Sequence, residues 1–138
     1  MKKNELISLI NDILKDHDFK RSGSTWKIKG TELTKIVNLQ KSSYGNMYYI
    51  NYGYIINALE LDGMRTHVFK RLEADDILDC ERKKLTDEVV KDELLFKLKE
   101  LICEFNSVNT IKDLSNIAAS EYMLAMIPYK VKVYLGLV

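Results

Sequence analysis

Amide side chains recur at two-residue spacing in a segment that is otherwise rich in β-branched and aromatic residues. Asn38 and Gln40 lie two positions apart, and Tyr49 and Asn51 repeat this spacing further along the chain. Residues two apart in an extended strand point to the same sheet face. Because asparagine is depleted in strands, this pattern indicates either a polar binding face or amides that hydrogen-bond one another and fix the strand register. Both interpretations stay open at this point.

A histidine and an arginine follow in the next predicted strand. The even spacing of His67 and Arg71 again predicts a common face. Imidazole can act as a general base or a ligand, and the arginine fork can bind a carboxylate or phosphate through two hydrogen bonds. The more ordinary alternatives are a histidine that hydrogen-bonds within the fold and an arginine that pairs with Glu73 or Asp75. The candidate site for a ligand or partner consists of Asn38, Gln40, Asn51, His67, Arg71 and Tyr49.

A cluster of tyrosines lies beside these amides. Five tyrosines fall between positions 44 and 54. Tyrosine provides contact area at low entropic cost, so such a cluster is typical of protein interfaces. The alternative, which we favour, is a sheet face packed beneath helices with the hydroxyl groups at its rim.

The predicted sheet is also basic. Its cationic residues are Lys20, Arg21, Lys27, Lys29, Lys35 and Lys41. Basic strands with aromatic residues can bind single-stranded nucleic acid. However, the formal net charge is only +1, and no motif of a nucleic-acid-binding family is present. We therefore attribute the lysines to protection of exposed strands and expect no nucleic-acid partner.

Motifs for catalysis, cofactor binding or metal coordination are absent from the sequence. It contains no GxSxG, HExxH, phosphate-binding loop or dinucleotide fingerprint. Cys80 and Cys103 have neither CxxC spacing nor a neighbouring histidine. Cys103 lies in an apolar helical pattern and is predicted to be a buried free thiol. We expect no cofactor and no metal, and we favour a non-enzymatic function while the enzymatic alternative stays open.

Length and composition favour one domain spanning residues 1–138. The chain is 46% hydrophobic and 30% charged, which is ordinary for a globular protein. No stretch approaches the roughly 18 apolar residues of a membrane span, and the N-terminal residues lack the apolar core of a signal peptide. These features predict a cytoplasmic protein without a membrane partner. They leave the oligomeric state, including a homo-oligomer, open.

Four strands are predicted in the region that must position the candidate site. Their ranges are 25–29, 35–42, 47–59 and 65–72. The connections are too short for helical crossovers, so we expect an antiparallel meander. Asp62 and Gly63 predict a turn before the last strand.

Helical patterns flank these strands. An amphipathic pattern covers residues 5–16, and Asp18 is a candidate for the left-handed residue that ends this helix. Residues 75–79 predict a short helical turn. Thr86 is expected to cap a long helix, and Thr110 with Asp113 resembles a capping box for another. Residues 129–138 fit both a strand and a helix, and we favour the helix.

This order of elements predicts an α+β fold. An N-terminal helix precedes an antiparallel β-meander of about four strands, and C-terminal helices pack on one sheet face.

The chain resembles a bacterial family catalogued as domain of unknown function 4304. The resemblance covers roughly residues 5–75 and is carried by Phe19–Trp26, Val37–Ser42, Tyr49–Gly53, and His67 with Arg71 and Leu72. Asp18 departs from the glycine usual in that family before the phenylalanine. The resemblance implies a small bacterial cytoplasmic protein and assigns no role to any residue.

The leading functional hypothesis is a non-enzymatic bacterial binding domain that recognises another protein. Small size, the absence of a catalytic constellation and the tyrosine-rich sheet favour it. Neutralisation of a toxin, as by small α+β immunity proteins, is one concrete form. The alternative is a small-molecule or phosphate-binding domain, or an enzyme, that uses the polar sheet face.

Overall fold

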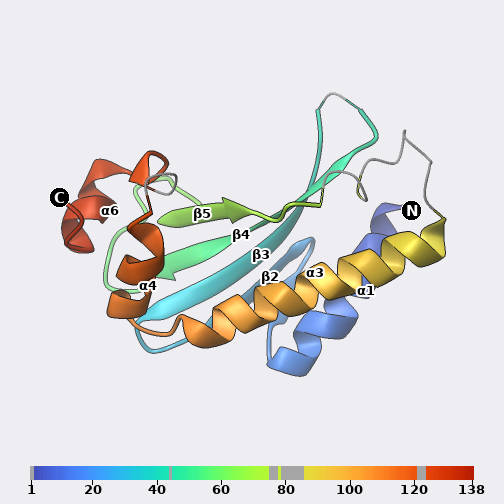
Figure 1. Cartoon of the computed structure of the whole chain (residues 1–138), viewed down its shortest axis with the longest axis horizontal. Coiled ribbons are helices and arrows are strands. Elements are labelled where there is room, and N and C mark those ends of the chain that lie inside the picture. Colours follow the sequence, from blue (N-terminus) through green and yellow to red (C-terminus); the bar gives the residue numbers. More distant parts are fainter. Residues whose placement is uncertain (1, 44, 75–77, 79–85, 121–123) are drawn as a thin grey trace.

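A central antiparallel sheet and the helices around it make up the computed structural model, which describes residues 2–43, 45–74, 78, 86–120 and 124–138 (Figure 1). Helix α1 (Lys3–Leu14) precedes the strands, and helices α3 (Asp87–Ser107), α4 (Ile111–Ala118) and α6 (Tyr129–Tyr134) follow them. The predicted α+β fold is therefore confirmed.

The sheet is a meander in which each strand pairs with its neighbour in the sequence. The strands are β1 (Lys20–Ser22), β2 (Thr25–Lys29), β3 (Leu33–Lys41), β4 (Tyr48–Ile56) and β5 (Val68–Arg71). All four pairings are antiparallel. The sequence predicted about four strands and missed β1, because three exposed residues carry no alternation of polar and apolar side chains.

The helix ends follow the predicted capping chemistry. Asp18 adopts the left-handed conformation, with φ of 67°, directly after the 3₁₀ turn η1 (Lys15–His17) that ends α1. The Thr86 side chain accepts a hydrogen bond from the backbone N–H of Val89. Thr110 and Asp113 form a reciprocal capping box at the start of α4. The ambiguous C-terminal segment is helical in α6. The helical turn expected at 75–79 lies outside the described residues, except for Leu78.

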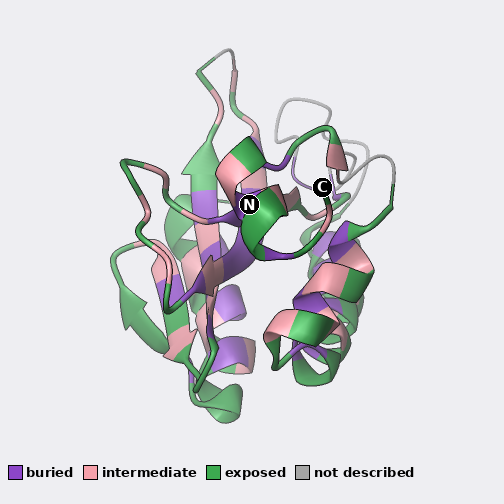
Figure 2. Ribbon diagram, turned by 90° about the vertical axis from the view of Figure 1, so that its left-hand side faces the viewer, coloured by how far each residue is buried: buried purple, intermediate pink, exposed green. Residues whose placement is uncertain are grey.

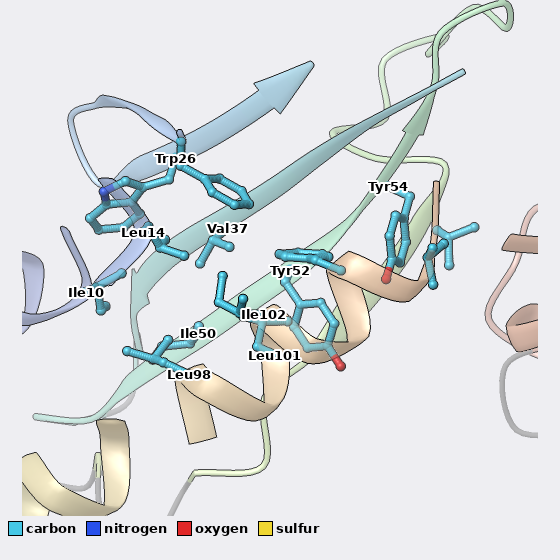
Figure 3. Close-up of a cluster of buried hydrophobic side chains, with 14 of the residues drawn as sticks. Ile10, Leu14, Trp26, Val37, Ile50, Tyr52, Tyr54, Leu98, Leu101 and Ile102 are labelled. Carbon is cyan, nitrogen blue, oxygen red and sulfur yellow. The ribbon is translucent and has the colours of Figure 1, made fainter. Parts of the chain in front are cut away.

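The core lies between the sheet and the helices α1 and α3 (Figure 3). Alternate side chains of β2, β3 and β4 meet the apolar faces of the two helices. The residues labelled there are Ile10, Leu14, Trp26, Val37, Ile50, Tyr52, Tyr54, Leu98, Leu101 and Ile102. Edge-on contacts of Phe105 with Tyr52 and Tyr54, at centroid distances of 5.8 and 5.6 Å, continue this layer along α3.

Burial is concentrated between the sheet and the helices, whereas exposed and half-buried segments predominate on the outer sides (Figure 2). Helices α4 and α6 lie at the end of the sheet where β4 ends and β5 begins (Figure 1). Among the described helices, none combines the length and apolarity needed to cross a membrane.

The prediction of a buried Cys103 is wrong. Cys103 is a free thiol, but it is exposed on α3. The buried side of this helix is formed by Leu98, Leu101, Ile102 and Phe105. Successive residues of an α-helix are rotated by about 100° around its axis. Cys103 therefore points about 100° away from Ile102 and lies outside the buried stripe.

Candidate functional site

The candidate site lies on the sheet face opposite α1 and α3. No helix in the described part of the chain packs on this face in Figure 1. We call it the open face and define it by the residues that share it through successive cross-strand pairs. They are Lys20, Ser22, Thr25, Lys27, Lys29, Thr34, Ile36, Asn38, Gln40, Tyr49, Asn51, Gly53, Ile55, Phe69 and Arg71.

The predicted amides meet on the open face and hydrogen-bond there. Asn38 pairs directly with Asn51 across β3 and β4. The Asn51 amide donates to Gln40 Oε1 at 2.7 Å. The Asn38 amide donates to Thr25 Oγ1 at 3.0 Å. The amides therefore bond to one another and to their neighbours, as expected of side chains that fix strand register.

Arg71 is anchored at the end of this amide row. Its Nε donates to Asn51 Oδ1 at 2.9 Å. Its guanidinium carbon lies 4.0 Å from the centroid of the Tyr49 ring and 5.8 Å from that of Phe69. No described residue accepts a hydrogen bond from its Nη groups, and Asp75 lies outside the described residues. Arg71 is thus an exposed cation whose orientation is set by one hydrogen bond and two aromatic rings.

His67 does not join the other candidate residues. It is only 1% exposed. Its Nδ1 accepts from the backbone N–H of Ile56 at 2.8 Å, so its Nε2–H donates to the carbonyl of Glu60 at 2.9 Å. The sequence analysis placed His67 and Arg71 on one face by assuming that both lie in the same strand. His67 lies outside this strand, because β5 begins at Val68. His67 is a structural hydrogen-bonding group, the ordinary alternative considered for it.

Gly53 allows β4 and β5 to approach closely beside the site. A Cβ atom at this position would lie 2.1 Å from the carbonyl oxygen of Val68. Gly53 pairs with Phe69, and the backbone carbonyl of Val68 occupies the place that a side chain would take. Any larger residue would force the two strands apart and displace Phe69 and Arg71.

The tyrosine cluster divides between the two sheet faces. Tyr48, Tyr52 and Tyr54 are buried in the core. Tyr49 is half-buried on the open face, and Tyr44 lies outside the described residues. The core interpretation, which the sequence analysis favoured, therefore holds for most of the described tyrosines.

A second polar cluster, absent from the predictions, lies between α3 and the covered face. Tyr54 donates its hydroxyl hydrogen to Glu104 Oε2 at 2.8 Å, and Lys70 forms an ion pair with Glu104. The Lys70 ammonium also lies 5.3 Å from the centroid of the Tyr52 ring. The partners are far apart in sequence. One signal was readable: Glu104 follows Leu101 by three positions and therefore borders the buried stripe of α3.

Burial and charge shift the titration of this cluster. Burial first, and then the Glu104 carboxylate, raise the pKa of Tyr54 well above the ordinary 10.0 and raise that of Tyr52 as well. Burial lowers the pKa of Lys70, but the hydrogen bond to Glu104 and the neighbouring charges outweigh it, and the net shift is upward. The cluster thus retains a neutral phenol and a charged lysine at neutral pH.

Lys35 belongs to the covered side of the sheet. Its ammonium donates to the carbonyl of Phe105 and, at 2.9 Å, to Asn109 Oδ1, where α3 ends. Burial lowers its pKa, and the opposing charge of Asp113 partly offsets this. Lys35 therefore does not contribute to the charge of the open face.

A family model described as "Domain of unknown function (DUF4304)" matches residues 10–115. The chain belongs to this family. No curated protein and no solved structure matches it. The match covers every strand in the described part of this DUF4304 chain and hence the whole open face. Within the described residues, no group of three His, Cys, Asp or Glu side chains is placed to hold a metal ion.

Proposed function

We propose that this chain is a non-enzymatic bacterial binding domain that acts in the cytoplasm and recognises another protein through the open face. Neutralisation of a toxin is one concrete form of this activity. The observation that carries the proposal is the anchored, exposed Arg71 guanidinium on a sheet face that no described helix covers.

Arg71 has the properties of an interface hot spot. Arginine and aromatic residues dominate binding energy at protein interfaces. Here Tyr49 and Asn51 restrict the arginine side chain, so less conformational entropy is lost when a partner binds. Phe69 lies beside it and remains 39% exposed, which provides apolar area for contact.

The hydrogen bonding of the other candidate residues supports a protein partner over a small ligand. The small-molecule alternative required His67 as a base or ligand-binding group and the amides as additional donors. Both nitrogens of His67 and the amides of Asn38 and Asn51 already bond within the fold. What remains available is an extended surface centred on Arg71.

Co-purification with the products of neighbouring genes tests this proposal. We expect a partner to be retained by the wild-type chain and its affinity to fall about tenfold or more in Arg71→Ala. Arg21→Ala is the matched control, because Arg21 is an exposed arginine of β1 that points away from the open face. The proposal fails when no partner is recovered, or when both variants bind as the wild type does. Circular dichroism establishes that both variants are folded.

A further inference from the structure

The strand residues of the open face carry positive charge without any carboxylate. Its cations are Lys20, Lys27, Lys29 and Arg71, and no aspartate or glutamate occurs among the residues that define it. Glu32 and Glu73 lie beyond the ends of the strands. The whole chain has 21 lysines and arginines against 20 aspartates and glutamates, a formal net charge of +1, so the residues outside this face carry a net negative charge and the face differs from the rest of the molecule.

Two of these cations stand directly opposite each other. Lys20 of β1 pairs with Lys27 of β2, and both side chains are exposed. Cβ atoms of directly opposed residues lie about 5 Å apart, and like charges in such a pair destabilise the sheet. No described residue forms an ion pair with either lysine. An anionic group bound between them would relieve this repulsion.

Apolar side chains and bonded amides lie between the lysines and Arg71. Ile36 on β3 and Ile55 on β4 lie beside the hydrogen-bonded Asn38 and Asn51, and Phe69 precedes Arg71 by two positions on β5. Because neighbouring strands lie about 4.8 Å apart, the three steps from Lys27 on β2 to Phe69 on β5 span about 14 Å. The open face therefore has cations at both sides, and between them it offers the apolar side chains of Ile55 and Phe69 beside amides that are already hydrogen-bonded.

This arrangement fits a protein better than a nucleic acid. Reading bases requires free donors and acceptors, but the amides of Asn38 and Asn51 are engaged within the sheet. Stacking of bases requires open rings, but one face of Tyr49 is covered by Arg71. Lys35 projects to the other side of the sheet and cannot extend a track for phosphates.

The geometry points to an acidic protein surface as the partner, with carboxylates at both sides of a central apolar side chain. This inference rests on the proposed function, because it names the chemistry of the partner that the open face would bind. One carboxylate accepts from the Nη groups of Arg71, and others lie between Lys20 and Lys27. The apolar side chain contacts Phe69 and Ile55.

Titration of the isotope-labelled full chain, followed by two-dimensional NMR, tests this chemistry. The first probe is a short peptide with acidic residues at both ends and a central Leu-Phe pair. The second is the same peptide with amides in place of the acids, and the third is a short oligothymidylate. We expect the acidic peptide to shift the open-face resonances, with affinity that falls as NaCl rises from about 0.05 M to about 0.5 M. Arg71→Ala and Lys27→Glu should each weaken it about tenfold, and Arg21→Ala should leave it unchanged.

The remaining outcomes overturn the inference in distinguishable ways. Equal binding of the neutral peptide would refute the acidic chemistry while leaving protein recognition intact. Tighter binding of oligothymidylate would replace a protein partner by nucleic acid. If no probe shifts the open face, the acidic surface is rejected. The proposed function is then judged separately by the Arg71-dependent co-purification.

Discussion

The candidate residues of this chain divide into those that can meet a partner and those that hold the sheet. Arg71 and Tyr49 are anchored but accessible, whereas His67 is enclosed. The Nδ1 atom of His67 accepts a hydrogen bond from the backbone N–H of Ile56, where the pairing of β4 and β5 ends. It thus takes the role that a backbone carbonyl has within the sheet. The same residue type could serve catalysis elsewhere, and here burial with both nitrogens bonded decides the role.

Replacement of His67 by alanine should lower the free energy of unfolding by about 1–3 kcal/mol, because the buried N–H of Ile56 loses its acceptor. His67→Asn should recover part of this loss by placing an oxygen near the position of Nδ1. Urea unfolding measures both effects. His17→Ala is the control, since His17 is exposed and its loss should cost less than about 0.5 kcal/mol. Equal stability of the His67 and His17 variants would contradict the structural role.

Helix α3 is attached to the sheet by polar contacts as well as apolar packing. Glu104 binds Tyr54 and Lys70 at once, so it links one helix to two strands. This link was not predictable from periodicity, which reports the face of each element but not the partner across the interface. The open face, by contrast, followed from strand alternation, and the amides of Asn38 and Asn51 do lie opposite each other.

The pKa shifts in this link predict alkaline destabilisation. The pKa values of Tyr54 and Lys70 are raised on folding from 10.0 and 10.5, so the folded state binds protons more tightly than the unfolded state. Their contribution to stability is fully present below about pH 10 and is lost as the pH rises above these unfolded values. Absorbance titration should show that Tyr52 and Tyr54 ionise only as the chain unfolds. Ionisation of Tyr52 and Tyr54 in the folded chain would refute the buried network.

Glu104→Gln isolates the carboxylate of this link. It should lower the free energy of unfolding at neutral pH by about 1–3 kcal/mol, because Lys70 loses its ion-pair partner in a half-buried position. Urea unfolding provides the measurement. Glu100→Gln on the same helix is the matched control, because Glu100 is exposed. A similar loss in both variants would assign the effect to the helix in general.

Across the molecule, the sequence predicted elements better than it predicted contacts. Hydrophobic alternation located β2 to its observed ends, and the cap residues Thr86 and Thr110 located two helices. The sequence analysis missed the short strand β1 and wrongly predicted that Cys103 is buried, because neither has a strong hydrophobic pattern. The direction of side chains beyond strand ends was also predicted wrongly. His67 is the example, because side chains alternate between faces only within the paired residues and β5 begins one residue later. Which groups on the sheet are free for binding depends on hydrogen bonds that no spacing encodes.

Helix α6 tests whether the whole chain unfolds as one unit, because it lies beyond the matched residues 10–115. Val131 is fully buried and Val133 is 53% exposed on the same helix. Val131→Ala should lower the free energy of unfolding by about 2 kcal/mol, and Val133→Ala by less than about 0.5 kcal/mol.

The fluorescence of Trp26, the single tryptophan, reports unfolding at the contact between β2 and α1. In one cooperative domain the urea midpoint followed by Trp26 shifts in Val131→Ala together with the midpoint from circular dichroism. A Trp26 midpoint that stays unchanged while the helical signal is lost earlier would show that α6 unfolds independently. The open face would then belong to a smaller cooperative unit than the chain, because the strands that carry it would not depend on the C-terminal helix.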